Sequence, residues 1–311
     1  MTDNTLQTLT DDEIRQTRWY YQVELRPGVY TDGPEQHTAA MVRSLAERID
    51  LAGTQCLDLG TQEGLMAVSL ARLGAETVVA YDRLDLSDRI AMVKEAYEVD
   101  FDYQHGLYLH ELSAALQTAG YDPFDVVVFA GVLYHMIDPL AGLGTARSFV
   151  RENGLLILET AAIVSDENAL FFNAGARYHD SSSYFLPSLT WLDYCLRMLR
   201  LKPIDCHHIS RPESGSRCRI AILCRAMDAP LPLPNDKWMT KRWITDDFQA
   251  VALDFDALAS PAPPVNYATD ENVLLPHHDQ TESVDIFETV MQGNPWPHHP
   301  SQARLNLSDY V

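Results

Sequence analysis

The stretch Gln55-Cys-Leu-Asp58-Leu-Gly60-Thr-Gln-Glu-Gly64-Leu-Met-Ala-Val-Ser-Leu-Ala71 decides the fold. Its apolar beginning predicts a strand over 55–60, and the helical spacing of its apolar end predicts a helix over 66–74. Glycines at the turn between them expose backbone N–H groups at the start of the helix and let a ligand approach the main chain. The stretch therefore predicts a ligand-binding βα unit, and a tight turn without a ligand is the alternative.

Strand and helix patterns continue to alternate after this unit, which predicts a parallel sheet covered by helices on both faces. The strand patterns are 77–82, 101–105, 125–131 and 155–160, and the helical patterns are 86–99, 108–120 and 139–150. Two later strand patterns, 202–210 and 217–225, are joined by a turn that is too short for a parallel crossover. They predict an antiparallel hairpin that closes an α/β fold with a mostly parallel, seven-stranded sheet.

Two flanking regions differ from this core, which we expect over residues 36–228. Residues 1–35 combine acidic residues with Trp19-Tyr20-Tyr21 and predict an N-terminal cap or lid. Residues 229–311 hold 10 of the 17 prolines and 12 acidic against 4 basic residues. They predict an acidic, Pro-rich extension that packs on the core as loops and short helices.

Composition and charge exclude several function classes. The formal net charge of −21 disfavours nucleic acid as a partner, because affinity for a phosphate backbone comes largely from Lys and Arg. The five cysteines form no CxxC pair, which indicates free thiols. No apolar run reaches the roughly 20 residues of a membrane-spanning helix, so we expect no membrane contact and a cytoplasmic location. The expected partner is a small-molecule acceptor, and a homo-oligomeric state stays open.

A carboxylate stands at the end of the next strand, where Asp82 can accept hydrogen bonds from two ribose hydroxyls. The D-x-G-x-x-x-G spacing lacks the pyrophosphate seat of the dinucleotide fingerprint. With Asp82, the glycine turn and the closing hairpin, the chain resembles the class I S-adenosylmethionine (SAM)-dependent methyltransferases. That resemblance implies a Rossmann-like fold and S-adenosyl-L-methionine as cofactor.

The resemblance also implies which residues hold the cofactor. Asp58 would approach the methionine amino group, Gly60 would give close backbone contact and Asp82 would bind the ribose. The adenine would meet residues 105–108, where the acidic residue common in the family is missing. The implied set comprises Asp58, Gly60, Thr61, Gly64, Asp82, Arg83, Gly106, Leu107, Ala130 and Gly131.

A second motif, Gly131-Val-Leu-Tyr134-His135 followed by Pro139-Leu140, narrows the resemblance. It looks like the subfamily that includes tRNA wobble-uridine carboxymethyltransferases and bacterial small-molecule tailoring methyltransferases. We expect methylation of an oxygen or nitrogen of a small molecule, such as a biosynthetic intermediate. A carboxymethyltransferase-like enzyme ranks second, because a carboxylated SAM and a tRNA need cations and the chain has four lysines. The third alternative is a non-catalytic SAM-binding scaffold.

Three residues are candidates for catalysis. His135 follows the fourth strand of the core at the edge where open α/β sheets bind ligands, and imidazole titrates in the range useful for a general base. A packing role is the alternative. Glu159 ends the fifth strand and can orient a donor, bind an amine or cap the next segment. His179, beside Asp180, lies in an insertion that lines the acceptor pocket or forms a surface loop.

Aromatic residues supply the candidate acceptor surface, although some of them will belong to the core. Those in the candidate set are Tyr20, Tyr21, Tyr134, Tyr178 and Tyr184. The pairs His207-His208, His277-His278 and His298-His299 raise the question of a metal. Adjacent side chains on a strand point to opposite faces, so we expect no metal site.

Overall fold

The computed structural model describes residues 9–34, 37–165, 167–209, 215, 217–229, 231 and 307. The expected extension 229–311 therefore lies almost entirely outside the described residues, as do His277-His278 and His298-His299. The limits 1–35, 36–228 and 229–311 stay predictions. Within the described part of the chain, no helix has the length and apolar character needed to cross a membrane.

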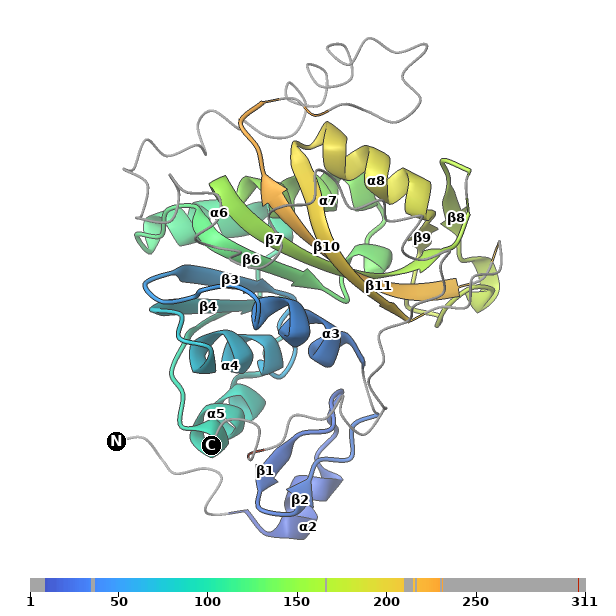
Figure 1. Cartoon of the computed structure of the whole chain (residues 1–311). Helices are drawn as coiled ribbons and strands as arrows, with labels where there is room; N and C mark the ends of the chain where they lie inside the picture. The colour runs from blue at the N-terminus through green and yellow to red at the C-terminus, as the bar shows by residue number, and fades with distance from the viewer. Residues whose placement is uncertain are drawn as a thin grey trace.

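A seven-stranded sheet forms the centre of the molecule (Figure 1). Its strands, in spatial order, are β10 (Leu201–Ile209), β11 (Arg217–Ala226), β7 (Val150–Ile163), β6 (Phe124–Ala130), β3 (Gln55–Leu59), β4 (Thr77–Asp82) and β5 (Asp102–His105). Only β11 runs antiparallel to its neighbours, since β10 and β7 both pair with it in that sense. The predicted fold class is confirmed, including the closing hairpin.

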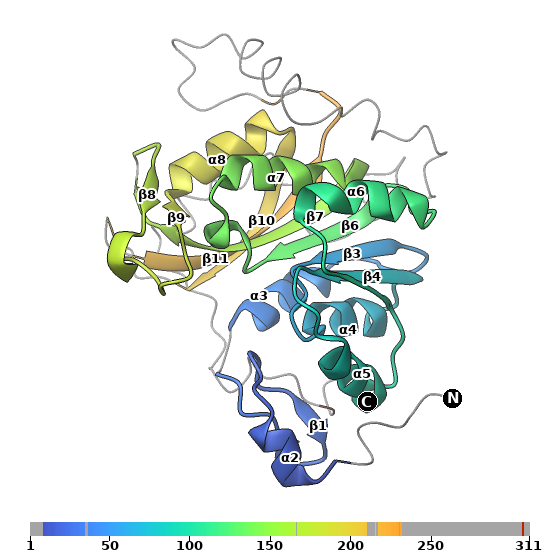
Figure 2. The ribbon, with the colours of Figure 1, turned by 180° about the vertical axis from the view of Figure 1, so that it is seen from behind.

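Helices cover both faces of the sheet, as Figures 1 and 2 show from opposite sides. One face carries α3 (His37–Ala46), α4 (Leu65–Arg72) and α5 (Ser87–Tyr97), and the other carries α6 (Leu109–Thr118), α7 (Pro139–Ser148) and α8 (Leu189–Met198). Two helix starts follow local rules: the Asp138 and Ser188 side chains each accept a hydrogen bond from the backbone of the first turn. Pro139 takes the first helical position of α7, where its missing N–H costs nothing.

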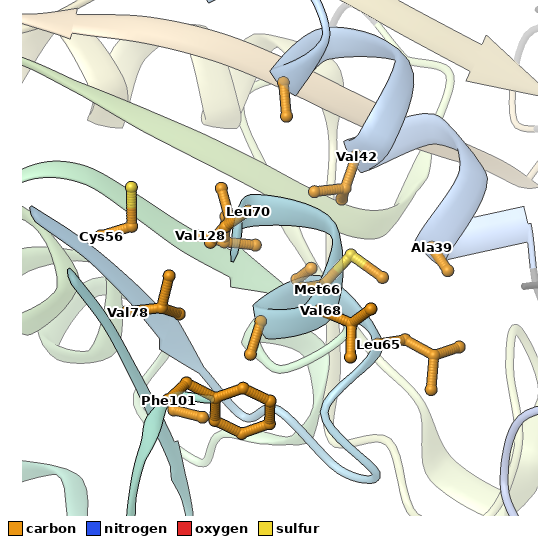
Figure 3. Close-up of a cluster of buried hydrophobic side chains, with 14 of the residues drawn as sticks. Ala39, Val42, Cys56, Leu65, Met66, Val68, Leu70, Val78, Phe101 and Val128 are labelled. Atoms are coloured by element: carbon orange, nitrogen blue, oxygen red, sulfur yellow. The ribbon is translucent and has the colours of Figure 1, made fainter. Parts of the chain in front are cut away.

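The core explains why these segments form a layered structure. Strand side chains on both faces are buried because each face is covered, so β6 is buried at every position. Figure 3 shows Val42 of α3, Leu70 of α4 and Val128 of β6 meeting in one apolar cluster. Burying about 100 Å² of apolar surface contributes roughly 2.5 kcal/mol, so this cluster stabilises the part of the sheet that carries the glycine turn.

The strand β7 is longer than the parallel strands beside it. Glu159 pairs with Ala130, the last residue of β6, and β7 continues to Ile163. β11 follows it over this extra length, with Arg217 opposite Ile163. The two strands therefore form a wall beyond the carboxyl edge of the sheet.

Two smaller sheets lie outside this wall. The insertion after β7 forms β8 (Leu170–Phe172) and β9 (Phe185–Pro187), with the short 3-10 helix η2 (Ala174–Ala176) between them. The N-terminal cap contains α2 (Asp11–Gln16), β1 (Glu24–Arg26) and β2 (Val29–Tyr30). The cap packs on the α5 side of the molecule, and Ile14, Val23 and Leu25 are buried there (Figure 1).

Candidate functional site

The glycine turn leaves β3 through three residues with positive φ. These are Gly60 at +80°, Gln62 at +50° and Gly64 at +86°. The backbone N–H groups of Gly60 and Thr61 both donate to the Tyr81 carbonyl, at 2.8 and 3.0 Å, which holds the turn against the end of β4. A Cβ atom at Gly60 would lie 2.3 Å from Cγ2 of Val132, so only glycine fits between the turn and the segment after β6.

Asp58 is buried beneath this turn. Its Oδ2 accepts a hydrogen bond from Oγ1 of Thr61 at 2.5 Å, and its carboxyl also interacts with the backbone of Ala67 in α4. The pKa of Asp58 is raised to about 7, mainly by burial. The two hydrogen bonds lower this pKa, and the charge of Asp82 raises it. None of these acting groups is a cation. The predicted approach of Asp58 to the cofactor through the turn stays a prediction.

Asp82 is held in place by the turn itself. Its Oδ2 accepts from the backbone N–H of Gln62 at 2.9 Å, and its Oδ1 accepts from that of Leu84 at 2.9 Å. Each carboxylate oxygen has a further lone pair, so the side chain can still accept two hydrogen bonds from a ligand. This geometry is compatible with the ribose-binding role that the family resemblance implies. That role stays a prediction.

The predicted adenine side lies after β5. Gly106 has a φ of +78°, and a Cβ atom there would meet nothing within 4 Å. The Leu107 carbonyl accepts a hydrogen bond from the Tyr81 hydroxyl at 2.7 Å, which fixes this loop beside β4. Arg83 is exposed next to Asp82. The structure thus places Arg83, Gly106 and Leu107 near the carboxyl ends of β4 and β5, as the sequence predicts.

The segment after β6 brings the second motif to the same sheet edge. Gly131 has a φ of +70°, and its N–H donates to the Glu159 carbonyl at 3.0 Å. The 3-10 helix η1 (Leu133–His135) follows directly. Tyr134 is buried, whereas His135 is half-buried. Ala130 and Gly131 therefore lie between the glycine turn and the candidate base.

An arginine of β11 connects the elements around Tyr134. Arg219 donates to both carboxylate oxygens of Glu159, from Nε at 2.7 Å and from Nη2 at 2.6 Å. It also donates from Nη1 to the Tyr134 hydroxyl at 3.0 Å and from Nη2 to Oγ1 of Thr38 at 2.8 Å. Glu159 is 0 % exposed, and the bidentate pair balances its negative charge. Both of its carboxylate oxygens are bound to Arg219.

Two histidines pack against the Tyr134 ring. The ring centroids of His135 and His179 are 4.3 and 4.9 Å from that of Tyr134. Nδ1 of His135 lies 3.1 Å from the Ser182 carbonyl, and Nδ1 of His179 lies 2.8 Å from Oδ2 of Asp180. A carbonyl and a carboxylate oxygen can only accept, so these two contacts favour a proton on Nδ1 and a lone pair on Nε2. The Ser182 and Ser183 hydroxyls also lie near these nitrogens, at 3.2 and 3.0 Å.

The sequence left open whether His179 lines a pocket or lies on a surface loop. Its side chain is 15 % exposed and packs against Tyr134. Burial lowers its pKa, while the Asp180 carboxylate opposes that effect. This shift favours the neutral ring, and the catalytic role of His179 stays a prediction.

The aromatic candidates divide between the site and the insertion. Tyr20 is 37 % exposed, and Tyr21, which meets it edge-on at 4.9 Å, is buried. Burial raises the pKa of Tyr134, and the Arg219 charge opposes that effect. Tyr178 packs partly buried beside Tyr134, and Tyr184 donates its backbone N–H to the Tyr134 carbonyl at 2.8 Å. Tyr178 and Tyr184 of the insertion therefore lie with Tyr134, whereas Tyr20 and Tyr21 belong to the N-terminal segment.

Sequence reasoning missed three residues of this region: Thr38, Glu63 and Arg219. Arg219 lies on a strand that the sequence predicts only as part of the closing hairpin. Glu63 lies inside the glycine turn, where its acidic character was visible. The contact of Arg219 with Glu159 joins positions 60 residues apart, which no local pattern can reveal.

The residues around the glycine turn fit S-adenosylmethionine, which carries positive charge on its sulfur and its amino group. Asp58 and Asp82 place two carboxyl groups here. Asp58 is buried, and the groups that shift its pKa include no cation. A positively charged ligand would supply the missing charge. A phosphate would meet repulsion from the same groups.

Comparisons with known proteins agree with this geometry. A family model described as a methyltransferase domain matches residues 35–194, about half of the chain. The chain therefore belongs to this methyltransferase family, within the class I SAM-dependent methyltransferases. S-adenosylmethionine is the cofactor of that class.

The relatives differ in the acceptor that their names state. A tRNA U34 carboxymethyltransferase of Trichlorobacter lovleyi is 28 % identical over 168 residues, which cover 54 % of this chain and 50 % of the relative. A ubiquinone biosynthesis O-methyltransferase of Cereibacter sphaeroides is 34 % identical over 129 residues, covering 40 % and 49 % of the two chains. The chain thus matches about half the length of these curated relatives.

A solved structure shares the fold. The N-terminal domain of EvdMO1 with SAH bound superposes with a TM-score of 0.51 at 21 % identity, covering 70 % of this chain and 98 % of that one. This likeness supports the fold alone.

Proposed function

We propose that the protein is a SAM-dependent methyltransferase that methylates an oxygen or nitrogen of a small molecule. One observation carries the proposal: the glycine turn touches the segment that bears Tyr134 and His135, since Val132 packs where a Gly60 side chain would be. The candidate cofactor seat and the candidate bases therefore share one edge of the sheet, where open α/β folds bind ligands.

The chain's own residues have two tasks in such a reaction. When bound, S-adenosylmethionine supplies a methyl group on a positively charged sulfur. The protein must align the acceptor with that group, and alignment alone can supply much of the rate. It must also take a proton from a hydroxyl or protonated amine, which falls to Nε2 of His135 or His179.

His135 is the leading base, and His179 is its rival. His135 lies closer to the glycine turn along the chain, and the Ser182 carbonyl holds it in the tautomer that a base needs. His179 has the same tautomer and is oriented by a carboxylate, an arrangement that also stabilises the protonated ring. Their separate variants decide between them.

A carboxymethyltransferase-like enzyme is the second candidate, favoured by the relatives named for tRNA U34. Arg219 is a cation at the acceptor side, but Glu159 already binds it in a bidentate pair. The net charge of −21 also disfavours tRNA. A small neutral or cationic acceptor fits this charge better.

Calorimetry and turnover test the proposal together. The purified protein is titrated with SAM, S-adenosylhomocysteine and carboxylated SAM, and is then assayed with tRNA and with a panel of phenols and amines. We expect binding of the first two ligands and methyl transfer to a small acceptor. Tight preference for carboxylated SAM with transfer to tRNA would support the second candidate. Binding without transfer to any acceptor would support the non-catalytic scaffold.

A further inference from the structure

Glu63 connects the glycine turn to the N-terminal cap. Its carboxylate is 0 % exposed, and it accepts hydrogen bonds from the backbone N–H of Tyr20 at 2.8 Å and of Tyr21 at 3.4 Å. Glu63 lies 43 and 42 positions after the two tyrosines, so these bonds are a tertiary contact between two regions. Burying a carboxylate is unfavourable unless it is hydrogen-bonded, which means that the cap and the turn depend on each other here.

Arg89 of α5 completes the link. It donates from Nη1 to Oε1 of Glu63 at 3.2 Å, and its guanidinium carbon lies 6.0 Å from the ring centroid of Trp19. Burial raises the pKa of Glu63, and the hydrogen bond from Tyr20 and the Arg89 charge oppose that effect. Glu63 thus meets a cation and two cap amides within one buried contact.

The neighbours of Glu63 belong to the candidate cofactor site. The N–H of Gln62 donates to Asp82, and the N–H of Gly64 donates to the Thr61 carbonyl at 2.9 Å. A ligand that binds Asp82 and the turn would therefore restrict the backbone on both sides of Glu63. Such a restriction reaches the cap through the Glu63 carboxylate.

Tyr20, the cap residue held by Glu63, is 37 % exposed and meets Tyr21 edge-on, with ring centroids 4.9 Å apart. Partial burial raises the pKa of Tyr20, the charge of Arg219 lowers it, and Glu159 and Asp180 raise it. The Tyr20 side chain therefore lies within electrostatic range of the network around Tyr134. Its backbone is bound to the glycine turn at the same time.

We propose that Glu63 is a positioning residue that makes cofactor binding and ordering of the Tyr20 segment one coupled event, so that the cap presents Tyr20 to the acceptor only when the glycine turn is held. This inference rests on the proposed function for its acceptor side. The link between Glu63 and the cap stands on the hydrogen bonds alone. Coupling of this kind is reciprocal: what stabilises the cap also strengthens cofactor binding.

Hydrogen–deuterium exchange at single amides tests the link in the ligand-free protein. In Glu63→Ala we expect the amides of Tyr20 and Tyr21 to exchange about 10-fold faster or more, because they lose a charged acceptor. The amides of Val23 and Thr31 serve as internal controls. They bond within the cap, to Oγ1 of Thr31 and to the Val23 carbonyl, and should keep their rates. Unchanged exchange at Tyr20 and Tyr21 in a folded variant overturns the proposal.

Matched variants separate a specific effect from a general loss of stability. Glu63→Gln keeps a carbonyl acceptor and should restore much of the protection, whereas Glu47→Ala removes a carboxylate from an exposed ion pair with Arg43 on α3 and should change nothing. Glu63→Gln also puts an NH2 group in place of one acceptor oxygen, so one of the amides of Tyr20 and Tyr21 should exchange faster than in the wild type while the other stays protected. Wild-type exchange at both amides in Glu63→Gln overturns the proposal, whether or not Glu63→Ala folds.

The coupling to the cofactor is measured with S-adenosylhomocysteine. The ligand should slow exchange at Tyr20 and Tyr21 in the wild type but not in Glu63→Ala, and its affinity for that variant should fall about 5-fold or more. Ligand binding to the wild type with no change at these amides overturns the coupling. If the wild type binds no ligand, the proposed function fails, and the ligand-free exchange still decides whether Glu63 holds the cap.

Discussion

The candidate cofactor half and the candidate acceptor half of the site are built in different ways. The candidate cofactor half consists of backbone groups in the turns after β3, β4 and β5 and of two carboxyls at the ends of β3 and β4. The acceptor half consists of side chains from the cap, α3, η1, β7, the insertion and β11. One half is therefore local and negatively charged, whereas the other is assembled over long distances around a neutralised ion pair.

This difference indicates how each half keeps its shape. Positive φ angles at glycines and hydrogen bonds to the Tyr81 carbonyl fix the backbone of the glycine turn, and Glu63 adds its link to the cap. The acceptor half depends on Arg219, which joins Glu159, Tyr134 and Thr38. A change on the cofactor side should affect ligand affinity, and a change on the acceptor side should affect turnover or stability.

The largest effect should come from the histidines. In the double variant His135→Ala/His179→Ala we expect kcat to fall about 10²- to 10⁴-fold, because both candidate bases are removed. Affinity for S-adenosylhomocysteine should not change, and exposed His110→Ala is the control. The single variants show which ring accounts for the loss. If His179 is the base, the acidic limb of the pH profile of kcat/KM lies below the ordinary value of 6.5, since burial lowers its pKa. Normal turnover in the double variant contradicts the assignment.

The ion pair should give the next largest effect, on stability. Arg219→Met leaves Glu159 buried without its cation, which costs about 3–5 kcal/mol of unfolding free energy. Adding Glu159→Gln should recover part of the loss, because the isolated charge is gone. Urea denaturation of the single and double variants measures the difference. Equal stability of the two variants would show that the buried charge is not the cause.

The same contrast explains how far the sequence alone leads. Alternating strand and helix patterns predicted the sheet and its closing hairpin. Each strand or helix buries one or both of its faces, and this burial appears in the local sequence as the spacing of apolar residues. The glycine turn after β3 and the position of Asp82 at the end of β4 followed from the same local patterns, whereas their binding roles stay predictions. The pairing of Arg219 with Glu159 was not, since it depends on β11 lying beside β7, and the partners of Glu63 depend on where the cap folds back. The packing of His179 on Tyr134 likewise required the path of the insertion.

On the cofactor side, Asp82→Ala should weaken S-adenosylhomocysteine binding about 10- to 100-fold, the effect of losing one or two hydrogen bonds to a charged group. Asp82→Asn should not rescue binding, because its amide nitrogen would face the N–H of Gln62 or Leu84. Asp88→Ala, on the exposed first turn of α5, is the control. Calorimetry gives the affinities. If Asp82→Ala binds S-adenosylhomocysteine as tightly as the wild type, the Asp82 carboxylate does not bind the cofactor.

The smallest effect should come from the proton on Asp58. Burial raises the pKa of Asp58 from the ordinary 3.8 to about 7, so between these values the folded state holds a proton that the unfolded chain has released. Its contribution to stability is complete at low pH and is lost as the pH rises through 7. The unfolding free energy should therefore fall by about 1 kcal/mol between pH 6 and pH 7 through this group. Asp58→Asn should flatten that part of the slope, and urea denaturation of both proteins at the two pH values measures it. If the slopes are the same, Asp58 is ionised in the folded state, and the negative charge that we assign to the cofactor half is already present without a ligand.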